Sequence, residues 1–220
     1  MKQDYTYIYD GMTAFEKEVK RWCDFLTALF CIIIFSPVFL LCYIAIKRDN
    51  DGPVIYKQIR IGRFGRPFYI YNFRSMVVDA EKDGKPQLWN GEKDLRLTKT
   101  GKFLRDHHLD ELPQFWNVLV GDMSFVGPRP ERKFYIKQIM KHDPRYECLY
   151  QIRPGITSMA TIYNGYTDTM EKMLKRLQMD LEYLENRSWW LDIKIVVLTF
   201  LNTLSARNSD FIVNNPLTKT

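Results

Sequence analysis

Cysteine and histidine are scarce in this sequence, which limits the metal and covalent sites that it can form. Four cysteines are present, at Cys23, Cys31, Cys42 and Cys148. No two of them have the C-x-x-C spacing of a zinc site, so neither a zinc site nor a disulfide framework is expected, and a reducing compartment fits better. Of the three histidines, His107 and His108 are adjacent and their side chains diverge, which favours a surface or helix-end role over metal binding.

Charge is absent from residues 25–46, which read FLTALFCIIIFSPVFLLCYIAI. As a straight helix these 22 residues would be roughly 33 Å long, about the thickness of a bilayer core. The run is too long for a signal peptide, and no small-x-small cleavage site follows it. A second apolar run, residues 188–204, is interrupted by Asp192 and Lys194, so we expect only one membrane segment.

Ser36-Pro37 lies in the middle of the charge-free segment and predicts a kink, because Pro37 has no N–H and clashes with the preceding turn. The Ser36 hydroxyl can satisfy a carbonyl that the kink frees. Basic residues stand on both flanks, so the positive-inside rule gives no orientation. These flanking residues are Lys17, Lys20, Arg21, Lys47 and Arg48. Two geometries stay open from the residues alone: a kinked spanning helix, and a segment that enters and leaves on the cytoplasmic side.

The rest of the chain predicts an α+β fold that is mainly helical. Two β-type runs within residues 54–78, separated by IGRFGRP, predict a hairpin. Helical patterns cover residues 99–107, 111–119 with Gly121 as C-cap, 131–142 and 170–184. In the last of these, a Met and Leu stripe indicates an amphipathic helix that packs against the core or the membrane. Trp189-Trp190 is typical of the membrane–water interface.

Positive charge exceeds negative charge by 6. Such a balance favours anionic partners: nucleic acid, anionic lipid or phosphate-bearing substrates. From Lys57 to Arg105 there are twelve basic residues against five acidic ones. This block follows the membrane segment directly, so it can rest on lipid head groups, at about 1 kcal/mol per basic residue near the surface, or gather phosphates. Most of its individual members are expected on a solvated face.

Asp110 and Glu111 stand side by side in HHLDELPQFWN, residues 107–117. Adjacent helical side chains point about 100° apart, so the two acids can contact different groups. Asp110 can face one ligand while Glu111 faces a metal. Pro113 is tolerated in a first turn but disfavours helical geometry just before it. We therefore expect a helix N-terminus near Asp110, which would keep that carboxylate ionised and could bind phosphate. The alternative is structural: an N-cap and a first-turn charge.

The neighbourhood of the acid pair favours chemistry. Arg105 lies upstream, and GDMS and GPRP follow at residues 121–124 and 127–130. A carboxylate can attack a phosphorus atom as a nucleophile. Such a reaction needs a divalent cation and arginines around the phosphates.

Together with the membrane segment, these motifs make the chain resemble a known family. It is the family of monotopic phosphoglycosyl transferases, also called bacterial sugar transferases, in a minimal single-domain form. The resemblance extends over roughly residues 20–200, and LDELPQ followed by GDMSFVGPRP is its most specific part. The matching motifs are the apolar segment with Ser36-Pro37, FRSM at 73–76, Asp94-x-Arg96-x-Thr98-x-x-Gly101-x-x-x-Arg105, LDELPQ at 109–114, NVLVGDMSFVGPRP at 117–130, RPGIT at 153–157, and the set Asp180, Tyr183, Asn186, Ser188 and Asp192.

The resemblance implies transfer of a sugar 1-phosphate from a nucleotide sugar, usually a UDP-sugar, to polyprenyl (undecaprenyl) phosphate. The products are polyprenyl-diphosphate-sugar and UMP, and the reaction starts the assembly of O-antigen, capsule, exopolysaccharide or glycoprotein glycans. Asp110 is expected to attack the β-phosphate and form a covalent phosphosugar intermediate, which the polyprenyl phosphate then attacks. Glu111, with Asp110, is expected to bind Mg²⁺. The residues expected to bind substrate are Arg74, Arg105, Arg129, Arg153 and Asp180.

The resemblance also implies an architecture and a location. The segment broken at Ser36-Pro37 becomes a re-entrant helix that dips into one leaflet, and interfacial helices surround the hairpin. The expected division is an N-terminal tail (1–20), the re-entrant helix (21–48), a cytoplasmic catalytic domain (49–204) and a C-terminal tail (205–220), with no large N-terminal membrane domain. We expect a protein of the bacterial inner membrane, with its catalytic domain on the cytoplasmic face and no nucleic-acid partner; whether it forms a homodimer stays open.

Two departures and two rival interpretations accompany this resemblance. Asn72 stands where the family often has lysine, and Tyr166 where it commonly has arginine, so nucleotide or sugar recognition is expected to differ. One rival is another membrane-anchored, metal-dependent glycosyltransferase or phosphatase that uses Asp79-Ala80-Glu81 as its metal site. The other is a non-enzymatic, basic membrane-surface adaptor or nucleic-acid binder, which leaves Asp110 and Glu111 unexplained.

Overall fold

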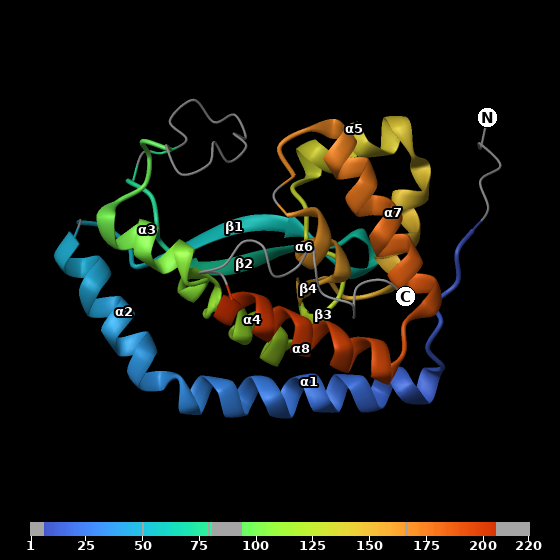
Figure 1. Cartoon of the computed structure of the whole chain (residues 1–220), viewed down its shortest axis with the longest axis horizontal. Coiled ribbons are helices and arrows are strands. Elements are labelled where there is room, and N and C mark those ends of the chain that lie inside the picture. Colours follow the sequence, from blue (N-terminus) through green and yellow to red (C-terminus); the bar gives the residue numbers. More distant parts are fainter. Residues whose placement is uncertain (1–6, 50, 79, 81–93, 166, 206–220) are drawn as a thin grey trace.

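Two helices joined by a sharp bend open the fold in the computed structural model, which describes residues 7–49, 51–78, 80, 94–165 and 167–205. Helix α1 (Ala14–Ile34) runs along one edge of the molecule, and α2 (Ser36–Asp49) turns away from it by 60° (Figure 1). The Ser36 hydroxyl donates to the Ile33 carbonyl at 2.8 Å, as expected for a carbonyl at a break. The predicted kink at Ser36-Pro37 is confirmed. Among the described residues, only this bent pair together, and no helix alone, is long and apolar enough to cross a bilayer.

Helix α1 begins inside the stretch expected to be a tail, because Thr13 and Glu16 form a capping box. Thr13 Oγ1 accepts from the Glu16 N–H at 3.3 Å, and Glu16 Oε2 accepts from the Thr13 N–H at 2.8 Å. These reciprocal bonds satisfy two donors that a helix start would leave unpaired. The helix therefore starts at Ala14, well before the charge-free segment.

The predicted hairpin is confirmed. Strands β1 (Ile55–Ile61) and β2 (Pro67–Phe73) are antiparallel, with Ile55 opposite Phe73 and Ile61 opposite Pro67. The short turn η1 (Arg63–Gly65) connects them. Phe73 is buried in a small core with residues of α2 and of the next helix, so the hairpin holds α2 on the protein.

Three short elements carry the segment around the acid pair. Helix α3 (Lys99–Asp106) starts at Thr98, whose hydroxyl accepts from the Gly101 N–H, and matches the predicted helix. The turn η3 (Leu109–Glu111) precedes α4 (Gln114–Val120), which ends at Gly121 with φ 94°. The helix expected from residue 111 thus begins three residues later, because Pro113 takes the cap position and the preceding residues form a separate tight turn.

A two-stranded parallel sheet that the sequence did not predict joins two Pro/Gly loops. Strand β3 (Ser124–Val126) pairs with β4 (Gly155–Thr157). The two chains approach so closely that a Cβ on Gly155 would lie 2.1 Å from the Gly127 nitrogen, a distance no side chain tolerates. The sheet therefore positions the loop at 127–130 that follows β3.

The main core lies among the helices of the second half of the chain. These elements are α5 (Lys133–His142), η4 (Pro144–Gln151), α6 (Met159–Asn164), α7 (Met170–Asn186) and α8 (Trp189–Ser205). The stripe predicted on α7 is buried here, including Met173, Leu177, Leu181 and Leu184. Its core packing is confirmed, and the mainly helical α+β class is confirmed with it.

A buried ion pair fastens α8 to α1, and the two helices lie along the same side of the molecule (Figure 1). Lys20 Nζ lies 2.6 Å from Asp192 Oδ2, and both residues are less than 10% exposed. Tyr183 Oη donates to Asp192 Oδ1 at 2.7 Å. Asp192, which interrupts the second apolar run, is therefore a structural partner of Lys20.

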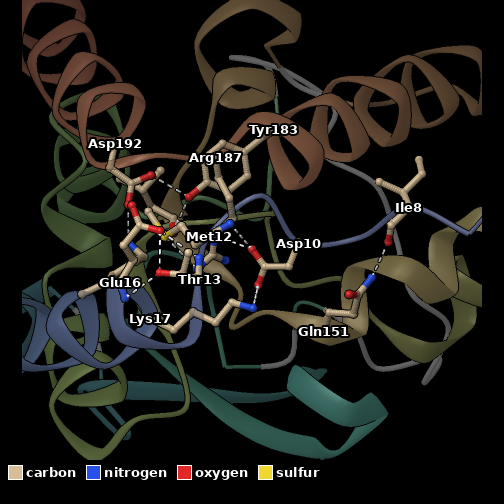
Figure 2. Close-up of polar contacts among 12 residues, drawn as sticks. Ile8, Asp10, Met12, Thr13, Glu16, Lys17, Gln151, Tyr183, Arg187 and Asp192 are labelled. Carbon is tan, nitrogen blue, oxygen red and sulfur yellow. Dashed lines mark hydrogen bonds and ion pairs between the residues drawn. The ribbon is translucent and has the colours of Figure 1, made fainter.

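Residues 7–13 are bound to the second half of the chain (Figure 2). Gln151 Nε2 donates to the Ile8 carbonyl at 2.7 Å, and Asp10 forms ion pairs with Lys17 and Arg187 at 2.9 and 3.2 Å. Met12 is 3% exposed. The described part of the expected N-terminal tail is therefore fixed to the fold, because its polar and apolar groups both have partners there.

Candidate active site

Asp110 and Glu111 lie in η3, and each faces a different arginine. Arg105 Nε on α3 is 3.8 Å from Asp110 Oδ2, and Arg129 Nη2 is 3.0 Å from Glu111 Oε1. Asp110 is 6% exposed, whereas Glu111 is only partly buried. The structure therefore brings together four of the predicted site residues, and the two acids point to separate partners as the sequence suggested.

Burial dominates the electrostatics of Asp110. It raises the pKa of Asp110 to about 7, and the neighbouring Glu111 charge acts in the same direction, while Arg105 and Arg129 only partly offset them. The expectation that a helix N-terminus keeps Asp110 ionised is corrected, because Pro113 is the cap of α4 and Asp110 lies in the preceding turn. With such a pKa, Asp110 is about half ionised at pH 7.

Arg129 connects the acid pair to a small cavity beyond it. The Glu111 carboxylate raises the pKa of Arg129, which keeps the guanidinium charged. The cavity is lined on its polar side by Arg129, Glu131, Tyr146, Arg176 and Asp180. Asp180 thus lines the same cavity as Arg129, and substrate binding by Asp180 stays a prediction.

Three residues of this network were missed from the sequence. Glu131 accepts from Arg176 Nη1 at 2.9 Å and lies 3.7 Å from Arg60 Nη1, so it lies near two cations, the buried Arg176 and the half-buried Arg60. A signal existed for Arg176, because it shares with Asp180 the buried side of α7. Charges spaced four apart on an inward face indicate a buried polar site.

The other two predicted substrate-binding residues each donate to a backbone carbonyl. Arg74, at the end of β2, donates from Nη1 to the Asp51 carbonyl at 2.9 Å. Arg153 donates from Nε to the Gly121 carbonyl at 2.8 Å, at the C-terminal end of α4, whereas the acid pair precedes the N-terminal end of that helix. Substrate binding by Arg74 and Arg153 stays a prediction.

The break in the membrane segment packs beside the acid pair. Val38 and Phe39, just after Pro37, join a cluster that also contains Leu109 and Leu112, the residues that flank the acids. The ring of Phe35 lies 6.2 Å from that of Phe115 on α4. The position of η3 is therefore coupled to the bend between α1 and α2.

Two carboxylates are the metal donors available at this site. Within the described ranges, no group of three or more His, Cys, Asp or Glu side chains is placed to hold a metal ion. Mg²⁺ is commonly bound through one or two carboxylates plus substrate phosphates, so Asp110 and Glu111 fit a cation that is completed by a substrate. His107 Nδ1 lies 2.8 Å from the Phe103 carbonyl, a local helix-end contact. Asp79, Glu81 and Tyr166 lie outside the described residues.

We expect Asp180→Asn to change how stability depends on pH. Burial raises the pKa of Asp180 to about 7 from 3.8, with Arg176 opposing the shift, and Oδ1 has no hydrogen-bond partner among the described residues. Between pH 4 and 7 the unfolded chain ionises at this residue while the folded protein keeps its proton, so wild-type stability falls over that window. Asparagine cannot ionise, so the variant should gain stability relative to wild type as pH rises.

Urea unfolding at several pH values between 4 and 8 measures this difference. Glu182→Gln, at an exposed position on the same helix, is the matched control and should run parallel to wild type. Parallel curves for Asp180→Asn as well would contradict a raised pKa for this carboxyl.

Comparison with known proteins adds an independent line of evidence. The family model described as bacterial sugar transferase matches residues 15–206. The chain is 44% identical over 182 residues to a UDP-glucose:undecaprenyl-phosphate glucose-1-phosphate transferase of Klebsiella pneumoniae, with 82% of this chain and 39% of that protein aligned.

Two further relatives agree with this match. An Aeromonas hydrophila UDP-N-acetylgalactosamine-undecaprenyl-phosphate N-acetylgalactosaminephosphotransferase is 40% identical over 85% of this chain and 44% of its own length. A Caulobacter vibrioides UDP-glucose:undecaprenyl-phosphate glucose-1-phosphate transferase is 38% identical over 86% of this chain and 71% of its own length. The chain spans less than half the length of the first two relatives.

Proposed function

Because this chain belongs to the bacterial sugar transferase family, we propose that it transfers a sugar 1-phosphate from a UDP-sugar to a polyprenyl phosphate such as undecaprenyl phosphate. The observation that carries the proposal is the buried Asp110 beside Glu111, with Arg105 and Arg129 directed at the two acids. A nucleophilic carboxylate, a second carboxylate and two guanidinium groups are the parts that transfer of a phosphoryl group requires.

The proposed reaction has two steps on the same carboxylate. In the first, an oxygen of the Asp110 carboxylate attacks the β-phosphorus of the UDP-sugar, the bond to the bridging oxygen breaks, and UMP leaves. In the second, a phosphate oxygen of the polyprenyl phosphate attacks that phosphorus, the bond to Asp110 breaks, and polyprenyl-diphosphate-sugar leaves with the carboxylate restored. One site can thus serve a water-soluble donor and a lipid acceptor in turn.

Arg105 and Arg129 are proposed to bind the diphosphate oxygens, since guanidinium groups match phosphate geometry and stay charged. Glu111, with Asp110, would hold Mg²⁺, which when bound neutralises phosphate charge. Asp180, which lines the same small cavity as Arg129, is proposed to contribute to donor binding. The burial of Asp110 favours attack, because it removes the water that would shield the charge of the carboxylate.

We further propose that α1 and α2 form a re-entrant membrane segment and that α8 rests at the interface. This is supported by the 60° bend at Ser36 and by large apolar side chains exposed on all three helices. They include Trp22, Leu26, Phe30, Ile33, Leu40, Leu41, Trp190, Ile193, Val197 and Phe200. A lipid acceptor is reached most directly from such a surface, on the cytoplasmic face of the inner membrane.

The donor reaction separates the proposal from its enzymatic rival. Incubation of the full chain in membranes with labelled UDP-sugar, polyprenyl phosphate and Mg²⁺ should release UMP and give a lipid-linked product. Release of UDP instead would indicate a conventional glycosyltransferase, and release of free phosphate a phosphatase. If no nucleotide were released with any UDP-sugar, the non-enzymatic adaptor would be favoured.

For the membrane segment, we expect both ends to react with a membrane-impermeant maleimide only from the cytoplasmic side. Cys23, which is exposed near one end, is a natural probe, and Arg48→Cys in a Cys23→Ser background probes the other. Labelling is compared between intact cells and inverted vesicles. Labelling of either end from outside intact cells would show a spanning helix instead.

A further inference from the structure

A second cavity lies at the other end of α4 from the acid pair. Arg21 on α1 donates to the Val118 and Leu119 carbonyls at 2.7 Å each, at the C-terminal end of that helix. The cavity beside it is bounded by α1, by η1 and by the segments around β3 and β4. Helix α4 has seven residues, so about 10 Å of helix separates this cavity from η3.

Cations crowd this cavity, and its two carboxylates are already engaged. Asp10 forms its ion pairs with Lys17 and Arg187, at 2.9 and 3.2 Å. Asp24 accepts from the Phe125 N–H at 3.3 Å and lies 3.9 Å from Lys20. The negative charge lining the cavity is therefore committed to these other cations.

Three arginines of the cavity direct their hydrogen bonds to backbone carbonyls. Arg21 binds the end of α4, Arg63 Nε donates to the Gln151 carbonyl at 3.0 Å, and Arg153 Nε donates to the Gly121 carbonyl at 2.8 Å. No carboxylate pairs with any of the three among the described residues. Burial lowers the pKa of Arg153, and Arg63 and Arg21 lower it further, while Asp24 and Glu18 offset this only in part.

A buried hydroxyl belongs to a residue in the wall of the same cavity. Ser124, the first residue of β3, is 2% exposed and lines the cavity, and its Oγ has no hydrogen-bond partner within the described part of the chain. A buried hydroxyl without a partner destabilises a fold, so its presence calls for a ligand that would pair with it.

We propose that this cavity binds a phosphate group, with Arg21, Arg63, Arg153 and the Ser124 hydroxyl as its donors. Guanidinium groups donate paired N–H bonds to phosphate oxygens, and a hydroxyl completes such a set. This site is separate from the acid pair, so it goes beyond the proposed function and does not depend on it. The phosphate can come from a small soluble anion or from a lipid head group, since α1 carries exposed Trp22 and Leu26 on its outer side.

The soluble source is tested by titrating the purified full chain in detergent with inorganic phosphate, at constant ionic strength, in a calorimeter. We expect Ser124→Ala to bind on the order of tenfold more weakly than wild type and Arg63→Gln/Arg153→Gln more weakly still. Ser124→Ala changes no charge, and without phosphate it should unfold at the same temperature as wild type or higher. Arg66→Gln, which removes an exposed cation outside the cavity, is the matched control and should keep the binding.

The lipid source is tested with the full chain in phosphatidylcholine vesicles with and without phosphatidylglycerol. A head-group site predicts that phosphatidylglycerol raises the unfolding temperature of wild type and Arg66→Gln but not of Ser124→Ala, while inorganic phosphate has little effect. A response to inorganic phosphate that Ser124→Ala loses would instead identify a soluble ligand. If wild type and Ser124→Ala respond alike to both probes, the attraction is unspecific and the proposal is wrong, whether or not the arginine variants fold.

Discussion

Asp110→Asn should lower the rate of UMP release on the order of 10⁴-fold or more, because an amide of the same shape cannot act as the nucleophile. The side chain is buried and close in size, so the fold should survive. Mass spectrometry of the intact protein and of its peptides, after incubation with UDP-sugar without acceptor, provides the sharper measurement. Wild type should gain the mass of a sugar phosphate on the peptide that contains Asp110, and the variant should not.

Asp122→Asn is the matched control, since Asp122 lies only partly buried just beyond α4, away from η3. It should form the adduct and release UMP at the wild-type rate. An adduct on another peptide in the Asp110→Asn variant would show that another residue is the nucleophile. It would not contradict the proposed transferase activity.

Asp192→Ala should lower the free energy of unfolding by about 3–5 kcal/mol, because it leaves Lys20 buried without its partner. The same change removes the acceptor of the Tyr183 hydroxyl at 2.7 Å. Denaturant unfolding with detergent held constant measures the loss.

An exposed ion pair provides the comparison. Asp106→Ala breaks the Lys102–Asp106 pair, whose side chains are about half exposed, and should change stability by less than about 1 kcal/mol. The double change Lys20→Met/Asp192→Leu should recover part of what Asp192→Ala loses, since it removes both charges of this pair. Equal losses for Asp192→Ala and Asp106→Ala would contradict the structural role of the buried pair.

Features that depend on neighbouring residues were predictable from the sequence. Pro37 located the bend, because it lacks an N–H wherever it stands, and IGRFGRP located the hairpin turn. The capping box of Thr13 and Glu16 was an equally local signal for the start of α1. The expected start followed the charge-free segment instead, although a loss of charge does not mark where a helix begins.

Features that depend on distant contacts were not predictable. Strands β3 and β4 have three residues each and exist because two loops pack backbone against backbone at Gly127 and Gly155. The raised pKa of Asp110 comes from burial, which no single stretch encodes. Motif spacing singled out Arg105 and Arg129, and both lie beside the acid pair, whereas Glu131 and Arg176 meet only in the folded chain.

The Lys20–Asp192 contact also determines when α1 can be covered by α8 during synthesis of the chain. The two residues are 172 positions apart, so Lys20 leaves the ribosome roughly 10–30 s before its partner at ordinary rates of synthesis. During that interval the inward side of α1, with Lys20 and Asp24, has no α8 to cover it. Helix α1 is therefore expected to stay at the boundary between membrane and water until α8 has been synthesised. Docking of α8 on α1 then completes this part of the fold.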